Sequence, residues 1–258
     1  MSTLSERLAV SPAGPPDVFT GAPAPGERLY GGLVVAQALH AAMRTALDAH
    51  LAHSVHAAFL STGRAGRPVH YHVERTRDGS SYSTRRVVAT QSERTLLVLH
   101  AGFQQPEDGE QYQPPAALDG LPHPDSLAPG RYDDDVFACR DIDPTGAAPH
   151  RRLMWGRLRA GAPLDERWAK LALAYHLDHG PTRAAREPHA DHPGVEGRMS
   201  VSLDHSVWFL RHDPLDDWVL STFTPISTGG GRGLVQGTVH NRAGLLLAAV
   251  AQEVVLRL

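Results

Sequence analysis

The residues that most readily suggest chemistry are histidines and a cysteine. The chain has 16 histidines and a single cysteine, Cys139. His176 and His179 are three residues apart, a spacing that can place two metal ligands on one face of a helix. Neither a His-Glu-x-x-His motif nor a set of cysteines and histidines at ligand spacing accompanies them in the sequence. The pattern therefore predicts scattered histidines that bind no metal, and a Cys139 that is packed and inactive.

Three other stretches resemble catalytic or binding motifs only in part. Asp204-His205-Ser206 contains the residue types of a hydrolase triad, but neighbours in a strand point to alternate faces and cannot converge. The glycine-rich residues 229–233 lack the Gly-Lys-Ser/Thr ending of a phosphate loop, which favours a strand connection facing the ligand. Asp133-Asp134-Asp135 is typical of a solvated loop. The sequence also contains no Gly-x-Ser-x-Gly, so a nucleophile-elbow hydrolase is unsupported.

The elements that must position any site occur twice. A step of 150 residues takes Phe59 to Phe209, Gly79 to Gly229 and Leu97 to Leu247 without a gap. An apolar helical stretch precedes each copy, at residues 33–43 and 168–177. Two copies, rather than many, indicate a duplicated structural unit and not a solenoid.

Each copy reads as one buried helix followed by long strands. The stretch that begins at Gly31-Gly32 is apolar on nearly every side, and such a helix belongs in a core. β-Branched and apolar runs follow at residues 83–90 and 95–101, and again at 219–225, 233–240 and 245–256. The pattern predicts an α+β chain with a tandem (double) hot-dog fold, in which each half is an antiparallel sheet wrapped around a central helix.

Proline-rich segments mark the expected boundaries. Residues 11–26 are dense in proline and glycine and should form an irregular lead-in. A second proline-rich stretch separates the two similar halves. We therefore expect an N-terminal hot-dog domain at 1–105, a linker at 106–135, and a C-terminal hot-dog domain at 136–258 that carries the catalytic residues.

The composition limits the partners. A net charge of −3 shows no basic field, so nucleic acid or an anionic membrane is not expected as a partner. No run approaches the roughly 18 apolar residues of a membrane span, and no signal peptide is recognisable. A single cysteine allows no intramolecular disulfide. The sequence predicts a cytoplasmic protein.

Sequence segments in both halves of the chain resemble those of one protein family. YGGLVVAQAL, beginning at Tyr30, and HSVHAAFLSTGRAGRPVHYHVERTRDGSSYSTRRVVATQ are similar to the first half of bacterial type II acyl-CoA thioesterases. SLDHSVWFLRHDPLDDWVL and GGGRGLVQGTVHNRAGLLLAAVAQE are similar to the second half. The resemblance runs from about Phe19 to the end of the chain. It implies two fused hot-dog domains that hydrolyse acyl-CoA thioesters without a covalent intermediate, a cofactor or a metal.

The resemblance also implies the site residues. By motif, the catalytic residues are Asp178 in LAYHLD, Ser202 in VSLDHS and Gln252 in AVAQEV, which would hold and activate water. Relatives often carry threonine in place of Ser202; the hydroxyl is kept, while the β-branched methyl is lost. Backbone N–H groups at the start of the first helix, at Gly31 and Gly32, are our candidates for binding the oxyanion and substrate.

The first copy has inert residues at the corresponding places. Alignment of the helices places Ala42 opposite Asp178, and the step of 150 places Ala52 opposite Ser202 and Gly102 opposite Gln252. The sequence therefore predicts one active site per chain.

Two other functions fit the same pattern. An enoyl-CoA hydratase would need an Asp-His pair in a hydratase motif, which the sequence does not show, and a non-catalytic acyl-CoA-binding protein could keep the fold. The family resemblance further implies a homodimer or homotetramer. Acyl chain length depends on pocket-lining side chains that the sequence does not identify.

Overall fold

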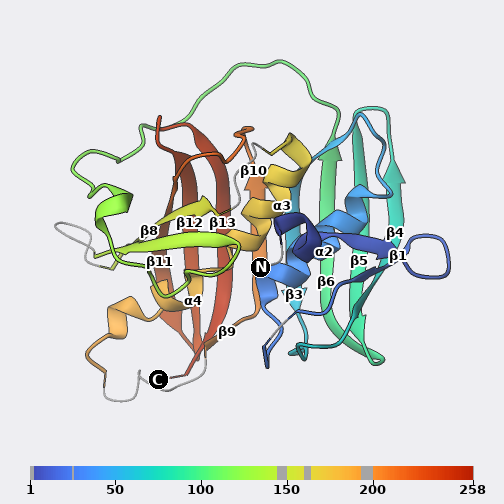
Figure 1. Cartoon of the computed structure of the whole chain (residues 1–258), viewed down its shortest axis with the longest axis horizontal. Helices are drawn as coiled ribbons and strands as arrows, with labels where there is room; N and C mark the ends of the chain where they lie inside the picture. Colours follow the sequence, from blue (N-terminus) through green and yellow to red (C-terminus); the bar gives the residue numbers. More distant parts are fainter. Residues whose placement is uncertain (1–2, 25, 144–149, 160–163, 193–199, 258) are drawn as a thin grey trace.

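A single antiparallel sheet runs through most of the molecule. The computed structural model of the chain describes residues 3–24, 26–143, 150–159, 164–192 and 200–257. Its elements in order are α1 Leu4–Leu8, β1 Val10–Pro12, β2 Val18–Gly21, α2 Gly31–Met43, β3 Leu51–Phe59, β4 Val69–Asp78, β5 Tyr82–Gln91, β6 Arg94–Gln104, η1 Pro124–Ser126, β7 Phe137–Ile142, β8 Arg152–Leu158, α3 Glu166–His176, α4 Pro181–Ala184, η2 Glu187–His189, β9 Ser200–Ser202, β10 Asp204–Phe209, β11 Val219–Gly229, β12 Arg232–Asn241 and β13 Leu246–Leu256. The predicted α+β class, with a large antiparallel sheet and few helices, is confirmed (Figure 1).

The order of the strands repeats the duplication seen in the sequence. Along the sheet it is β1-β2-β4-β5-β6-β3-β10-β13-β12-β11-β8-β7, with β9 paired to β13 off this path. The second half of that order mirrors the first, since β3 and β10, β6 and β13, β5 and β12, and β4 and β11 occupy matching places. The two halves meet where β3 pairs with β10, with Val55 opposite Val207. Backbone hydrogen bonds therefore continue across the junction.

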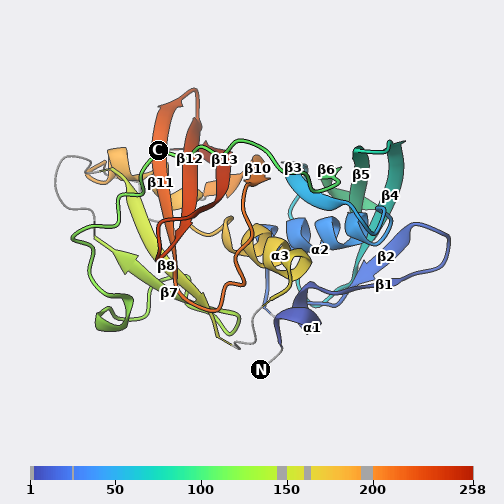
Figure 2. The same cartoon turned by 90° about the horizontal axis from the view of Figure 1, so that it is seen from above.

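The two principal helices lie side by side against the sheet (Figure 2). α2 packs against β3, β4, β5 and β6, and also against α3. The two helices run antiparallel, because the Tyr30 hydroxyl at the start of α2 donates to the Tyr175 carbonyl near the end of α3, while the His40 ring contacts the Trp168 ring at their other ends. In the described residues, no helix is both long and apolar enough to span a membrane.

Most sequence-predicted elements appear at the expected places, with one exception near the start. The helix expected from Gly31 is α2, and the strands expected at 83–90 and 95–101 are the cores of β5 and β6. The prediction of an irregular lead-in at 11–26 is wrong in part. β1 and β2 pair there, and β2 extends the sheet by pairing with β4. Tertiary pairing overrides the local bias of proline and glycine toward turns, because edge strands need fewer backbone donors.

The step of 150 residues does not hold on the last strand. In the second half, Val235 pairs with Gln252. Arg85 lies 150 residues before Val235, and it pairs with Ala101. Across this strand pair the counterpart of Gln252 is therefore Ala101, not Gly102 as the ungapped step predicted. Ala101 is fully buried, as Gln252 is. A shift of one residue exchanges the two faces of a strand, so an ungapped comparison placed the counterpart on the wrong face.

One polar side chain in α2 is explained by its partners. Gln37 is buried, yet its amide nitrogen donates to the Arg7 carbonyl at 2.8 Å and its oxygen accepts from the Tyr71 hydroxyl at 2.7 Å. A Cβ at Gly21 would lie 2.1 Å from Gln37 Oε1, so only glycine fits on β2 at this point. These contacts connect α2 to the N-terminal segment and to β4.

We expect Gln37→Leu to lower the free energy of unfolding by about 1–3 kcal/mol, because the Arg7 carbonyl and the buried Tyr71 hydroxyl lose their partner. Urea unfolding of the full chain would measure it. Adding Tyr71→Phe should cost less in the Gln37→Leu background than in the wild type, because the hydroxyl no longer has to be satisfied. Strictly additive effects would contradict this account.

Candidate active site

Asp178 lies two residues beyond the end of α3, against the start of α2. Its side chain is almost completely buried. A Cβ added at Gly31 would lie 2.7 Å from Asp178 Oδ2, and one added at Gly32 would lie 2.4 Å from the Tyr175 carbonyl oxygen. Both glycines are therefore required by the close approach of α2 to this segment. The structure thus places the first-half glycines chosen from the sequence directly beside the second-half aspartate.

Ser202 and Gln252 complete a triangle of hydrogen bonds with this carboxylate. The Ser202 hydroxyl donates to Asp178 Oδ1 at 3.1 Å, and the Gln252 amide donates to the same oxygen at 3.1 Å. The Gln252 amide also lies 2.6 Å from Ser202 Oγ. The pairing of β9 and β13, with Ser202 opposite Val254, brings the two strand residues together. The three residues expected from motifs far apart in the sequence are neighbours in space.

His205 belongs to this group and was missed by sequence reasoning. Its Nδ1 lies 2.5 Å from Gln252 Oε1, and the ring is fully buried. An imidazole N–H donating to Oε1 fixes the Gln252 amide so that its NH₂ group faces Asp178 and Ser202. The signal in the sequence was a histidine at the inward position of a strand. Position alone does not distinguish such a histidine from an ordinary buried one.

The neighbours of His205 point elsewhere, as strand alternation predicts. Asp204 Oδ1 accepts from the Glu253 amide at 2.7 Å, and Ser206 Oγ lies 3.1 Å from His56 Nδ1 on the other half. Asp204, His205 and Ser206 therefore form no triad.

Burial controls the charge of Asp178. Loss of solvent raises the pKa of this carboxyl above its ordinary value of 3.8. An electrostatic interaction with His205 and hydrogen bonds from Ser202, Gln252 and the Gly32 amide act in the opposite direction, and burial outweighs them. A carboxylate whose pKa is raised by burial is a stronger base than an exposed one and can take a proton from a bound water molecule.

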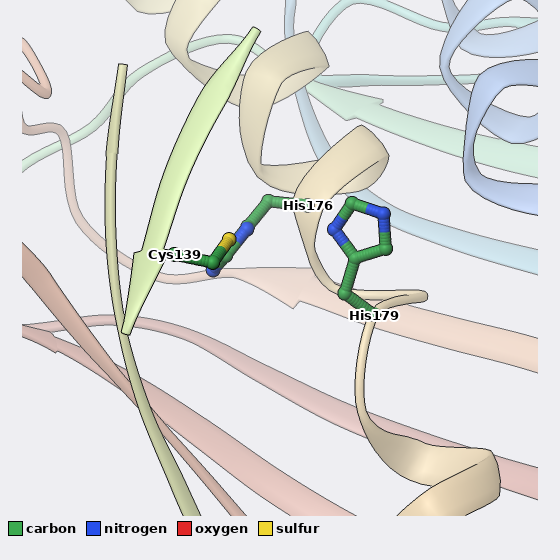
Figure 3. Close-up of side chains that lie close together, drawn as sticks. All are labelled: Cys139, His176 and His179. Atoms are coloured by element: carbon green, nitrogen blue, oxygen red, sulfur yellow. The ribbon is translucent and has the colours of Figure 1, made fainter. Parts of the chain in front are cut away.

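A second cluster of buried polar side chains lies close to Asp178 and includes its neighbour in the sequence, His179. Cys139, His176 and His179 have ligand atoms that all lie within 4.8 Å of one another, and all three residues are buried (Figure 3). No motif in the sequence connects Cys139 to the two histidines; the structure brings them together, because β7 places the cysteine against the end of α3. Burial lowers the pKa of His176 and of His179 to about 3, so both rings are neutral at physiological pH.

We expect His205→Leu to lower the free energy of unfolding by about 1–3 kcal/mol, because the buried Gln252 oxygen loses its donor. Chemical denaturation would measure it. Ser206→Ala is the matched control in the next position of the same strand; its exposed bond to His56 should contribute less than about 0.5 kcal/mol. Equal losses in the two variants would show that His205 does not hold Gln252.

Comparison with known proteins identifies the family to which the chain belongs. A model of the acyl-CoA thioesterase N-terminal domain matches residues 20–104, and a model of the acyl-CoA thioesterase C-terminal domain matches residues 106–256. The chain is 32% identical to acyl-CoA thioesterase 2 of Haemophilus influenzae over 251 residues, covering 89% of this chain and 88% of that one. It is 31% identical to human acyl-coenzyme A thioesterase 8, covering 90% of this chain and 82% of that one.

A solved structure gives the same result in three dimensions. The crystal structure of acyl-CoA thioesterase II TesB2 from Mycobacterium marinum superposes with a TM-score of 0.86 at 33% identity, covering 98% of both chains. The sequence match extends over both halves, and the structural match includes the sheet that joins them. The chain therefore belongs to the type II acyl-CoA thioesterase family.

Proposed function

We propose that this thioesterase hydrolyses fatty acyl-CoA to a free fatty acid and CoA, using water activated by Asp178, Ser202 and Gln252 and forming no covalent intermediate. The observation that carries the proposal is the convergence of two donors from separate strands on one oxygen of a buried carboxylate. Such an arrangement holds a base and a water molecule in fixed relative positions, which is a large part of what thioester hydrolysis requires.

The reaction needs one proton acceptor and one nucleophile. Asp178 takes a proton from water as the water oxygen bonds to the thioester carbonyl carbon. Ser202 and Gln252 orient that water, since a hydroxyl and an amide each donate and accept. When the carbon–sulfur bond breaks, the proton passes from Asp178 to the CoA sulfur. The products are a carboxylic acid and CoA, and the aspartate returns to its charged form.

The start of α2 supplies the donor for the developing oxyanion in this proposal. The first N–H groups of a helix have no acceptor within the helix, and the helix dipole favours negative charge there. Because the Gly32 amide already interacts with the Asp178 carboxylate, the Gly31 amide is the donor that we assign to the oxyanion. The first half would then contribute backbone donors and the second half the water-activating side chains.

We also propose the finer architecture that this division implies. Each half would be one hot-dog unit, with residues 1–105 around α2 and residues 136–258 around α3, joined by a linker at 106–135. The mirrored strand order and the antiparallel packing of α2 on α3 support it. Assembly into a homodimer or homotetramer stays a prediction of the family resemblance.

Two surface cavities differ in the charged residues that line them. A cavity of about 430 Å³ near Trp218 is lined by Asp213, Asp216 and Asp217, of which Asp217 is paired with Arg242. A smaller cavity beside Tyr30, of about 70 Å³, is lined by Arg28 and by Arg7, which is paired with Asp135. It lies next to the α2 N-terminus, where the thioester carbonyl is placed in the mechanism above.

We expect Asp178→Asn to lower kcat by roughly 10²–10⁴-fold, because an amide cannot accept the proton of the attacking water. Purified enzyme would be offered acyl-CoA chains from acetyl to palmitoyl while free thiol is followed. Asp204→Asn is the matched control: it changes an aspartate near the site, and its amide oxygen can still accept from the Glu253 N–H.

The same panel separates the alternatives. No thiol release with any chain length, together with saturable acyl-CoA binding, would favour a non-catalytic binding protein. If an enoyl-CoA is added to the panel, loss of its double bond without thiol release would favour a hydratase. Thiol release that survives in Asp178→Asn would keep the activity and exclude Asp178 as the base.

The acid limb of the pH profile should report the hydrogen bond from Ser202. Asp178 must be charged to act, so kcat/KM falls as the pH drops through its pKa. The Ser202 hydroxyl stabilises the charged form and lowers this pKa. We expect Ser202→Ala to move the acid limb to higher pH, and Ser202→Thr, which keeps the donor, to leave it in place. If the acid limb of Ser202→Ala is unchanged or moves to lower pH, the assignment of Asp178 as the base stabilised by Ser202 is contradicted.

A further inference from the structure

Three buried side chains at the end of α3 form a group that the thioesterase site does not use. Cys139 comes from β7, His176 is the last residue of α3, and His179 follows three residues later. One ligand atom from each lies within 4.8 Å of the other two. Figure 3 shows the side chains of Cys139 and His176 next to each other, with the His179 ring beside them. None of the three takes part in the hydrogen bonds among Asp178, Ser202 and Gln252.

Two of the ring nitrogens lack a partner. Within the described part of the chain, neither His176 Nδ1 nor His179 Nδ1 has a hydrogen-bond partner, although both atoms are buried. Leaving a buried polar atom unsatisfied costs roughly 1–3 kcal/mol, and such atoms are uncommon in native structures. Two such atoms on neighbouring rings, in a group whose ligand atoms and the Cys139 thiol lie within 4.8 Å of one another, point to a ligand between them.

The rings are held in place as metal ligands usually are. His176 Nε2 lies 3.2 Å from Ser221 Oγ, and this bond fixes the ring and leaves Nδ1 as the free donor atom. The His176 ring also stacks on Phe137 at 4.5 Å between centroids. His179 is stacked between two tyrosines, with centroid distances of 4.5 Å to Tyr30 and 5.1 Å to Tyr132. Only small rotations are open to either side chain.

The donor set selects the kind of ion. One thiolate and two neutral imidazoles suit Zn²⁺ or Cu⁺, whereas Mg²⁺ and Ca²⁺ prefer oxygen. In a zinc site the donor atoms are about 3.5 Å apart, so the side chains would close by roughly 1 Å from their present positions. Binding replaces the thiol proton, which leaves to solvent. Burial and the carboxylate of Asp134 raise the pKa of the Cys139 thiol, so the ion itself must displace the thiol proton; the same carboxylate acts on His176 and would offset the remaining positive charge of a divalent ion.

We propose that Cys139, His176 and His179 bind a single Zn²⁺ or Cu⁺ ion that ties β7 to the end of α3. The site is structural. It is separate from the hydrolytic residues, and its test does not depend on the proposed function.

The test uses the full chain, produced in medium supplemented with zinc or copper, because an ion enters such a buried site most readily during folding. Elemental analysis should find one zinc or one copper ion per chain. Replacement by Co²⁺ during refolding should give a thiolate-to-cobalt charge-transfer band, which requires a Cys139–metal bond. Anaerobic competition with a chromogenic Cu⁺ chelator, beside a zinc-indicator titration, would show which ion binds more tightly.

Three variants identify the ligands. Cys139→Ala should remove the charge-transfer band, and His179→Phe, which keeps the stacking on Tyr30 and Tyr132, should weaken metal binding at least about tenfold. His240→Phe is the matched control, because His240 is also buried with an unpartnered Nε2 but lies outside the group; it should bind as the wild type does. Circular dichroism would verify folding, with Cys139→Ser as the replacement if Cys139→Ala is unfolded.

Three outcomes would overturn the proposal. These are a wild-type chain that takes up no stoichiometric zinc or copper, a cobalt form without a charge-transfer band, or equal metal binding by Cys139→Ala. In those cases a buried water molecule that joins the two Nδ1 atoms would be the better account of the unpartnered nitrogens.

Discussion

The close approach of the α2 N-terminus to the segment after α3 is the constraint on which the rest of the site depends. Asp178 is buried at this contact, and a buried carboxylate is costly unless donors surround it. The two glycines that open α2 make the approach possible, because any side chain at Gly31 would collide with the carboxylate. One contact between the two halves therefore both buries the charge and positions backbone donors beside it.

The sheet positions the remaining polar side chains of the site. β9 and β10 both pair with β13, so Ser202, His205 and Gln252 are fixed by one ladder of backbone hydrogen bonds. His205 holds the Gln252 amide, and the amide in turn faces the carboxylate. Polar networks in a dry setting are favourable when their members are satisfied, and His205 satisfies the Gln252 oxygen, although within the described residues its own Nε2 has no partner.

Duplication gives the two halves the same framework and different chemistry. The mirrored strand order shows that both copies arrange their strands in the same order within one continuous sheet. Buried Ala101 lies where Gln252 lies in the second copy, so the first copy has no side chain at that place that could make the hydrogen bonds of Gln252. The first copy instead contributes the start of α2. The same end of α3 also carries His176 and His179, whose contact with Cys139 depends on the strand β7 that flanks the second half.

The sequence by itself determined the helices, the principal strands, the duplication and the identity of Asp178, Ser202 and Gln252 as motif residues. The helices, the strands and the duplication follow from local periodicity and from patterns along the chain, whereas the three site residues follow from the family resemblance. Only the tertiary structure decided which side chains meet. His205 on Gln252, Gly31 against Asp178, and Cys139 beside His176 each join segments far apart in the sequence or on different elements. Such contacts depend on strand register and helix packing, where a shift of one residue exchanges the two faces of a strand.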